Sequence, residues 1–261
     1  MIDIGVNLTS SRFDKDRADV ISRAKAANIS GLLVTGTNVK ESKHALALCQ
    51  HDPYFLYATA GVHPHDADHV EHDYIEQLRR LTLDSNVKAI GECGLDYNRN
   101  FSTPDNQKQV FSEQLALAAE VQLPVFLHQR DAFEPWLEII LPYVDQIPNF
   151  VSHCFTGSKS ELDKCLEHDM YIGVTGWVCD VKRGGDLREA VKHLPLERLM
   201  IETDAPYLTP KTIRPRPKSS RNEPAYLSYV VQELSVLTGY STQSIVQYSE
   251  QNSRRVFGLE Q

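Results

Sequence analysis

Residues 124–128 read Pro124-Val125-Phe126-Leu127-His128, a short apolar run that ends on a histidine. The run is too short for a helix and too continuously apolar for a strand with one solvated face. Strands of a parallel sheet that are covered by helices on both faces have this pattern. The stretch therefore predicts a fully buried strand that presents a polar side chain at its carboxyl end.

Similar apolar runs recur along the whole chain, and segments of helical periodicity separate them. The predicted strands are Ile2–Val6, Gly31–Thr35, Phe55–Gly61, Val87–Ile90, Pro124–Leu127, Phe150–Ser152, Tyr171–Val174 and Arg198–Ile201. The predicted helices lie at residues 19–27, 41–49, 73–83, 103–121, 161–168, 223–237 and 243–257. Eight such strands, most of them followed by a helical segment, in 261 residues are typical of an α/β fold of the (β/α)8 TIM-barrel type, with a doubly wound open sheet as the alternative. We expect a single barrel domain over residues 1–261.

Composition and charge limit the possible functions. Apolar residues make up 41% of the chain and charged residues 24%, which is ordinary for a globular protein. The net charge of −8 argues against general binding of polyanions, so nucleic-acid binding would need a local basic patch. The five cysteines form no Cys-x-x-Cys pair, as is typical of reduced thiols in the cytoplasm. We expect no membrane segment and no secretory signal, and nothing in the pattern requires more than a monomer.

Polar side chains follow the predicted strands at equivalent positions. In a barrel, the carboxyl ends of the strands converge on one face, where the active site forms. A single histidine at such a position is more often a hydrogen-bonded core residue than a metal ligand, but a whole set of them favours a site. The residues at these positions are Asn7, Thr37, His63, His65, Glu92, His128, His153, Thr175 and Asp204.

The imidazoles and carboxylates of this set predict a divalent metal site. We expect Glu92, His128, His153 and Asp204 to be metal ligands. A mixed nitrogen and oxygen set suits Zn²⁺ or Mn²⁺. A bound ion lowers the pKa of its water to about 7, which predicts a hydrolase. We assign Asp204 to orienting or deprotonating that water and Glu92 to holding the metal.

A basic segment follows Asp204 in the sequence. Residues 211–221 carry five cations and no acid, and their prolines favour an extended loop. A solvated surface loop is one interpretation. A cradle for a phosphate backbone is the other, and it is favoured because the overall acidic charge would otherwise repel nucleic acid. The residues that we expect to bind substrate here are Arg214, Arg216, Lys218 and Arg221.

The chain resembles the TatD family of metal-dependent nucleases across essentially its whole length. The motifs that carry the resemblance are Ala60-Gly61-Val62-His63-Pro64-His65, Gly91-Glu92-Cys93-Gly94-Leu95-Asp96, Pro124-Val125-Phe126-Leu127-His128-Gln129-Arg130, Leu199-Met200-Ile201-Glu202-Thr203-Asp204-Ala205-Pro206 and Arg221-Asn222-Glu223-Pro224. The resemblance implies a cytoplasmic 3′→5′ exonuclease that acts on single-stranded DNA and RNA. It also implies Mg²⁺ as the usual activating ion and a part in DNA repair.

One departure from the family pattern lies on the first strand. Most members have Asp-x-His-x-His there, whereas this chain has Asp3-Ile4-Gly5-Val6-Asn7, a variation typical of the branch after which the family is named. We therefore predict one well-bound ion and a second that binds weakly or together with substrate phosphate. We expect His63, as a catalytic group, and His65, nearer the rim, to reach the substrate rather than the metal. Asp3 is expected to brace a neighbouring ligand.

Two other classes of function compete with the nuclease. An amidohydrolase-like enzyme that cleaves C–N or ester bonds of a small molecule would use the same fold and ions. Such enzymes commonly need the first-strand histidine pair and a bridging lysine, and no lysine follows a predicted strand here. A binding or scaffold protein without catalytic activity is the third possibility.

Overall fold

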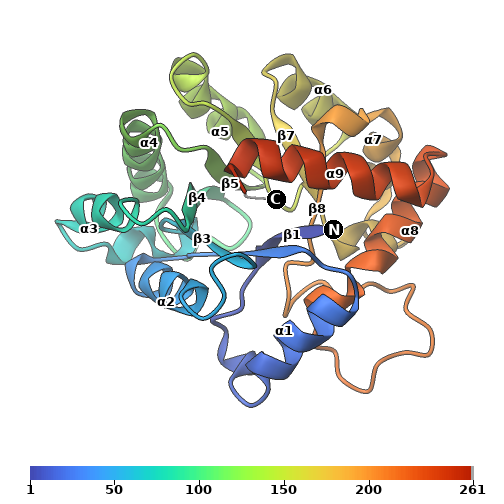
Figure 1. The fold of residues 1–261 in the computed structure, drawn as a ribbon. Helices are drawn as coiled ribbons and strands as arrows, with labels where there is room; N and C mark the ends of the chain where they lie inside the picture. The colour runs from blue at the N-terminus through green and yellow to red at the C-terminus, as the bar shows by residue number, and fades with distance from the viewer. Residues whose placement is uncertain (260–261) are drawn as a thin grey trace. The chain divides into compact units, whose positions relative to one another are not determined.

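The computed structural model describes residues 1–259. Two compact units are distinguished, one formed by residues 1–34 and 154–261, the other by residues 35–153. Both consist of parallel strands that alternate with helices (Figure 1).

The unit of residues 35–153 contains the middle of the sheet. Its strands are β3 (Leu56–Ala60), β4 (Val87–Asp96), β5 (Val125–Arg130) and β6 (Phe150–Ser152). Its helices are α2 (Val39–Cys49), α3 (Tyr74–Leu81), α4 (Pro104–Val121) and α5 (Phe133–Ile140), with short 3-10 helices at Pro64–His69 and Leu141–Tyr143. Thr103 precedes α4 and Pro104 occupies its first turn, where proline sacrifices no helical hydrogen bond.

The unit that contains both ends of the chain holds the remaining elements. Its strands are β1 (Ile2–Val6), β2 (Gly31–Val34), β7 (Tyr171–Val174) and β8 (Leu199–Ile201). Its helices are α1 (Arg17–Ala26), α6 (Lys159–Glu167), α7 (Gly185–Ala190), α8 (Leu227–Thr238) and α9 (Thr242–Phe257). Short 3-10 helices lie at Ser11–Phe13, Gly176–Cys179, Val191–His193, Leu196–Arg198 and Pro224–Tyr226.

Helix α9 is tied to the strands of its own unit by polar contacts. Asn252 donates from Nδ2 to the carbonyl oxygens of Leu196 and Leu199 at 2.8 Å, next to the start of β8. Glu250 pairs with the amino terminus of Met1 at 2.9 Å, just before β1. Figure 1 shows α9 passing β8 and the N-terminus. The last helix therefore closes over the start of the first and last strands.

The strands form one parallel sheet in the order β1-β2-β3-β4-β5-β6-β7-β8. The first and last strands are also neighbours, because Val6 bridges Ala205 in parallel and the amide of Asp204 donates to the carbonyl of Gly5 at 2.8 Å. Every residue of β1, β2, β3, β6, β7 and β8 is buried, as expected of strands covered on both faces. The predicted (β/α)8 barrel is confirmed, and the open sheet is not the fold.

Several boundaries differ from the prediction. Strand β4 continues to Asp96 and β5 to Arg130, so Glu92 and His128 lie within strands rather than after them. Helices α5 and α7 were not among the predicted helices. Helix α8 begins at Leu227 rather than at residue 223, because Pro224–Tyr226 form a 3-10 turn first. Within residues 1–259, no helix combines the length and apolar character that crossing a membrane requires.

Candidate metal centre

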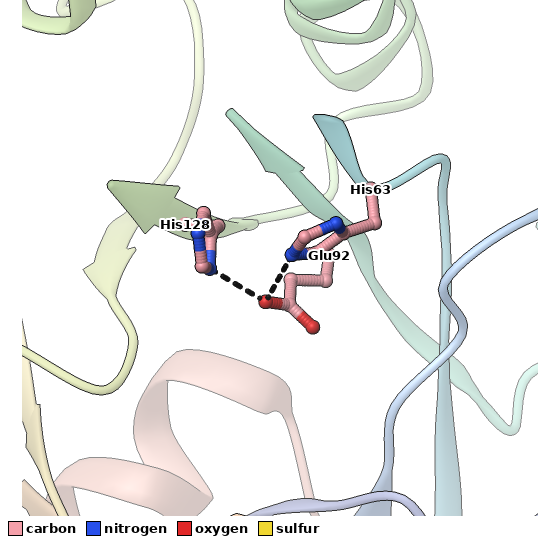
Figure 2. A group of neighbouring side chains, drawn as sticks. All are labelled: His63, Glu92 and His128. Carbon is pink, nitrogen blue, oxygen red and sulfur yellow. Dashed lines mark hydrogen bonds and ion pairs between the residues drawn. The ribbon is translucent and has the colours of Figure 1, made fainter. Parts of the chain in front are cut away.

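Three potential ligands gather where β3, β4 and β5 lie side by side: His63 follows β3, whereas Glu92 and His128 lie within β4 and β5. One donor atom from each of His63, Glu92 and His128 lies within 4.8 Å of the other two (Figure 2). Oε1 of Glu92 is 2.9 Å from Nδ1 of His128 and 3.4 Å from Nε2 of His63. His63 and Glu92 are buried, with exposed fractions of 9% and 6%. Nitrogen and carboxylate donors at these separations can hold a divalent cation after small side-chain adjustments.

Close packing of two glycines brings β3 and β4 together beneath this group. A Cβ atom on Gly61 would lie 2.5 Å from the Cα of Gly91, a distance that real Cβ atoms do not reach. Gly91 also has a φ of +140°, which L side chains rarely adopt. The close approach at Gly61 therefore requires glycine there, and Gly91 is required by its φ and by its approach to Phe126 of β5. Glu92 directly follows Gly91, and His63 lies two residues after Gly61.

His153 adds a third imidazole beside the same carboxylate. Its backbone amide donates to the carbonyl of Leu127 at 2.9 Å, which fixes the residue at the end of β6. Its Nε2 lies 3.2 Å from Oε1 of Glu92, and the residue is only 5% exposed. Three histidine nitrogens, from His63, His128 and His153, thus surround one carboxylate oxygen.

The electrostatics of the group favour metal binding at neutral pH. Burial lowers the pKa of His63 from 6.5 to about 4, so its ring is neutral at pH 7, and its Nδ1 accepts a hydrogen bond from the backbone amide of His65 at 3.1 Å. Burial alone would raise the pKa of Glu92, but its interactions with His153 and His63 and the hydrogen bond from His128 hold it well below its usual range. A neutral imidazole next to an ionised carboxylate is the protonation state that a divalent ion requires.

Asp96 lies close to two of the histidines, His65 and His128. The sequence prediction did not assign it a role. It is 1% exposed, and its Oδ2 lies 2.7 Å from Nε2 of His65 and 3.6 Å from Nε2 of His128. Burial disfavours the imidazolium form of His128, but the adjacent Asp96 and Glu92 raise its pKa. The sequence did contain a signal, because residues i, i+2 and i+4 of a strand point to one face, and Glu92, Gly94 and Asp96 have that spacing.

His65 therefore makes a contact that we did not foresee. We expected its ring near the rim with the substrate, and its side chain is indeed 31% exposed. Its Nε2 is held by Asp96, and its ring packs edge-on against that of His63, with centroids 4.2 Å apart. His63, which we also expected at the substrate, contributes a donor atom to the ligand group itself.

The remaining predicted ligand, Asp204, belongs to the unit that contains the chain ends. It follows β8 with a φ of +53°, and its Oδ1 accepts a hydrogen bond from Nδ2 of Asn7 at 2.9 Å. The preceding residue, Thr203, donates from its backbone amide and its hydroxyl to the fully buried Asp3, at 2.9 and 2.5 Å. Asp3 thus fixes the backbone that precedes Asp204, and its role in bracing a ligand stays a prediction.

The basic loop belongs to the same unit as Asp204. Its cations Arg214, Arg216 and Lys218 are exposed, as the interpretation of a phosphate cradle requires. Arg221 differs, because its guanidinium makes a two-pronged pair with Asp16 at 2.7 Å and also donates to the carbonyl of Arg12 at 2.8 Å. These contacts anchor one end of the loop to the segment before α1.

Comparison with known proteins gives matches along the whole chain. Residues 2–258 match the family model described as TatD related DNase. A protein of Pectobacterium atrosepticum named 3′-5′ ssDNA/RNA exonuclease TatD is 51% identical over 259 residues, which cover 99% of this chain and 100% of that protein.

Solved structures show the same fold. The crystal structure of YJJV, a TatD homologue from Escherichia coli K12, has a TM-score of 0.89 at 26% identity and covers 100% of this chain and 98% of that chain. A hydrolase of the TatD family from Entamoeba histolytica has a TM-score of 0.88 at 26% identity, with the same coverage. Each of these proteins is similar to the present chain from end to end.

Proposed function

Because this chain belongs to the TatD related DNase family, we propose that it is a metal-dependent 3′→5′ exonuclease that hydrolyses phosphodiester bonds of single-stranded DNA and RNA. The observation that carries the proposal is the convergence of Glu92 of β4, His128 of β5 and His63, which follows β3. A nuclease needs such a group because a divalent ion, when bound, supplies a water with a pKa near 7 and neutralises charge on the phosphate.

The ligands that we propose are Glu92, His128, His153 and His63. Glu92 is ionised and buried, so it provides the negative charge, and the imidazole of His63 is neutral. Binding of the ion would displace the proton that Asp96 and Glu92 favour on His128. His63 was expected at the substrate, and its low pKa and its place in the group favour a ligand role as well. Mg²⁺ is the ion that the family resemblance implies, and the nitrogen-rich donor set also suits Mn²⁺ or Zn²⁺.

Asp204 remains our proposed residue for orienting or deprotonating the attacking water. In support of this role, Asn7 donates to one of its carboxylate oxygens at 2.9 Å, which fixes the direction of the side chain. Its positive φ is uncommon outside glycine and asparagine, and the contacts of Asp3 with Thr203 hold the backbone that imposes it. Strain of this kind persists where the surrounding structure requires one particular geometry.

Arg214, Arg216 and Lys218 are proposed to bind the phosphate backbone of the substrate. Their exposure leaves them available to an anion, and they provide local positive charge on a chain whose net charge is −8. Arg221 is assigned a different part, since its pair with Asp16 already neutralises it. We propose that it holds the loop in place and contributes to substrate binding indirectly.

The second candidate function, cleavage of C–N or ester bonds in a small molecule, has less support. The relatives with about half of their residues identical are named as nucleases, and no specific contact in the described residues favours a small-molecule substrate. A cytoplasmic location, a monomeric state and a part in DNA repair remain predictions from the sequence and from the family resemblance.

A direct test uses the purified protein with Mg²⁺ or Mn²⁺ and a single-stranded oligonucleotide labelled at its 5′ end. We expect stepwise shortening from the 3′ end, and no shortening with a chelator present. His128→Ala and Glu92→Ala should lose both bound metal and turnover while the circular dichroism spectrum is retained. His44→Ala is the matched control, because His44 is an exposed histidine of the same unit that lies outside the ligand group. Near-normal rates in either site variant would show that the ligand assignment is wrong.

A further inference from the structure

An aromatic side chain is exposed on the loop that follows β4. Phe101 is 61% exposed, although a large apolar ring is usually buried. The ring does not lie on a bare surface: it packs edge-on against the imidazole of His65, with centroids 4.7 Å apart and planes at 70°. One side of the ring is therefore fixed by the protein, and much of the remainder faces solvent.

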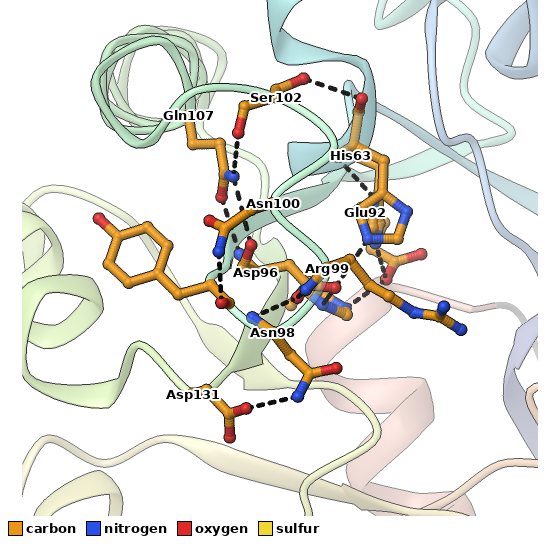
Figure 3. A network of polar contacts seen from close by, with 12 residues as sticks. His63, Glu92, Asp96, Asn98, Arg99, Asn100, Ser102, Gln107 and Asp131 are labelled. Atoms are coloured by element: carbon orange, nitrogen blue, oxygen red, sulfur yellow. Dashed lines mark hydrogen bonds and ion pairs between the residues drawn. The ribbon is translucent and has the colours of Figure 1, made fainter.

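Hydrogen bonds at both ends hold this loop in one conformation. At its start, Oδ1 of Asp96 accepts the backbone amides of Asn98 and Arg99 at 3.0 and 2.9 Å. Figure 3 shows Asp96 at the centre of this network, with Asn98, Arg99 and Asn100 around it. At its end, Ser102 donates from its hydroxyl to the carbonyl of His65 at 2.8 Å. A ring presented on a fixed loop loses little conformational entropy when it binds a partner.

A continuous series of ring contacts connects Phe101 to the candidate metal centre. The centroids of His128 and His63 are 4.4 Å apart, and those of His63 and His65 are 4.2 Å apart. The contact of His65 with Phe101 completes the series. Only the ring of His65 therefore lies between the rings of Phe101 and His63 in this series. Phe101 belongs to the loop that follows Asp96. A nucleotide whose phosphate lay at the metal centre would have its base close to this ring.

The surroundings of the ring suit a nucleotide. The guanidinium of Arg99 lies over the ring of Phe101, 5.8 Å from its centroid, so a cation covers one face of the ring and a base would stack on the other. Proteins that bind single strands without sequence preference combine such cations with aromatic rings, because every base has a π face. A protein-binding surface would need a wider apolar patch than one ring.

We propose that Phe101, together with Arg99, forms a stacking subsite for the base of the nucleotide next to the scissile phosphate. The proposal rests on the proposed nuclease function and specifies how that site recognises its substrate. The subsite would accept any base, purine or pyrimidine, and would prefer a nucleotide with a base to an abasic one. It therefore adds a determinant of substrate binding that is separate from the basic loop.

The test is a cycle that combines Phe101→Ala with oligonucleotides that carry one abasic nucleotide at each 3′-terminal position in turn. For the wild-type protein, we expect kcat/KM to fall by about 5- to 150-fold when the missing base is the one that stacks, and much less at the other positions. Phe101→Ala should lower kcat/KM on the intact oligonucleotide by a similar factor. It should then show no further loss on the abasic one. Phe101→Trp should restore the preference for the base.

Tyr54→Ala is the matched control, since Tyr54 is an aromatic residue of the same unit that is 75% exposed and should be indifferent to the abasic position. The proposal is overturned if Phe101→Ala keeps the position-dependent preference of the wild type. The same cycle measured as binding, by fluorescence anisotropy with a chelator present, does not require cleavage. Failure of the nuclease function would appear as no shortening of any oligonucleotide, whereas failure of the subsite would appear as an unchanged cycle in both measurements.

Discussion

Replacing Asp96 with asparagine tests the support that this carboxylate gives to the candidate metal centre. Its Oδ2 lies 2.7 Å from Nε2 of His65 and 3.6 Å from Nε2 of His128, and its Oδ1 accepts two loop amides. Asparagine has nearly the same volume and keeps an acceptor oxygen for the loop. It removes the negative charge and turns a donor toward imidazole nitrogens that need an acceptor. Nδ1 of His128 would then tend to carry the proton, on the side that faces Glu92.

The size of the effect follows from the distances. Removing a carboxylate behind a metal-binding histidine typically lowers metal affinity 10- to 100-fold, which is about 1.4 to 2.8 kcal/mol. The 3.6 Å separation from His128 exceeds a normal hydrogen bond, so the support is mainly electrostatic. We therefore expect the lower end of the range, a loss of about 10-fold in affinity.

Isothermal titration of Mn²⁺ into the metal-free protein at pH 7.5 measures this loss. Asp131→Asn is the matched control. It also removes one negative charge from a carboxylate that accepts a hydrogen bond from the loop, from Nδ2 of Asn98 at 2.7 Å. Asp131 is exposed, and among the described residues its side chain has no recorded contact with a histidine. Urea unfolding of both variants checks that the fold is retained. Equal Mn²⁺ affinities for the two variants would refute the role of Asp96.

The other predictions concern packing, pH and salt. Gly61→Ala should destabilise the protein by several kcal/mol in urea unfolding, because its Cβ would meet the backbone of Gly91 at 2.5 Å. Gly185→Ala is the control and should be neutral or slightly stabilising, because the space around its Cβ is open. An equal effect of the two substitutions would contradict the close approach of Gly61 to Gly91. Because burial lowers the pKa of His63 to about 4, the folded state resists a proton that the unfolded chain accepts, so the metal-free protein should lose about 3 kcal/mol of unfolding free energy as the pH falls from 6.5 to 4. His63→Gln should lack this loss, and a parallel decline in both proteins would contradict it. In the basic loop, Arg214, Arg216 and Lys218 can be replaced together by glutamine. The slope of log affinity for single-stranded DNA against log salt concentration should then fall by about 2. The same change at three other exposed lysines, Lys15, Lys40 and Lys108, should alter the slope less. An unchanged slope would return the loop to the interpretation of a solvated surface segment.

The strands were predictable from the sequence because burial on both faces leaves a continuous apolar run. Their polar ends were predictable for a related reason: parallel strands bring their carboxyl ends to one edge of the sheet. His63, Glu92, His128 and His153 could therefore be expected together before their distances were known. Which of them share one oxygen could not, because that depends on side-chain directions that strand positions do not specify.

The prediction failed where a polar residue interrupted the apolar pattern of a strand. Glu92 ended the apolar run of β4, so the prediction stopped at Ile90, although the strand continues to Asp96. Helix α5 was missed for a comparable reason, because Pro135 within Phe133–Ile140 reads as a helix breaker. It occupies the first turn, where the amide has no partner within the helix and its loss costs nothing. The partner of Arg221 was invisible as well, since Asp16 lies 205 residues away in the chain.

The altered first strand can be understood from the contact between Asn7 and Asp204. An amide nitrogen has no lone pair to offer a metal, so Nδ2 of Asn7, which points to Asp204, acts as a hydrogen-bond donor. The hydrogen bond from Asn7 holds Oδ1 of Asp204. Because both oxygens belong to one planar carboxylate, the same bond also limits the direction of Oδ2. Asp3 also helps to orient Asp204, because its carboxylate accepts hydrogen bonds from the backbone amide and the hydroxyl of Thr203, the residue before Asp204. We infer that the first strand here orients Asp204 instead of binding an ion.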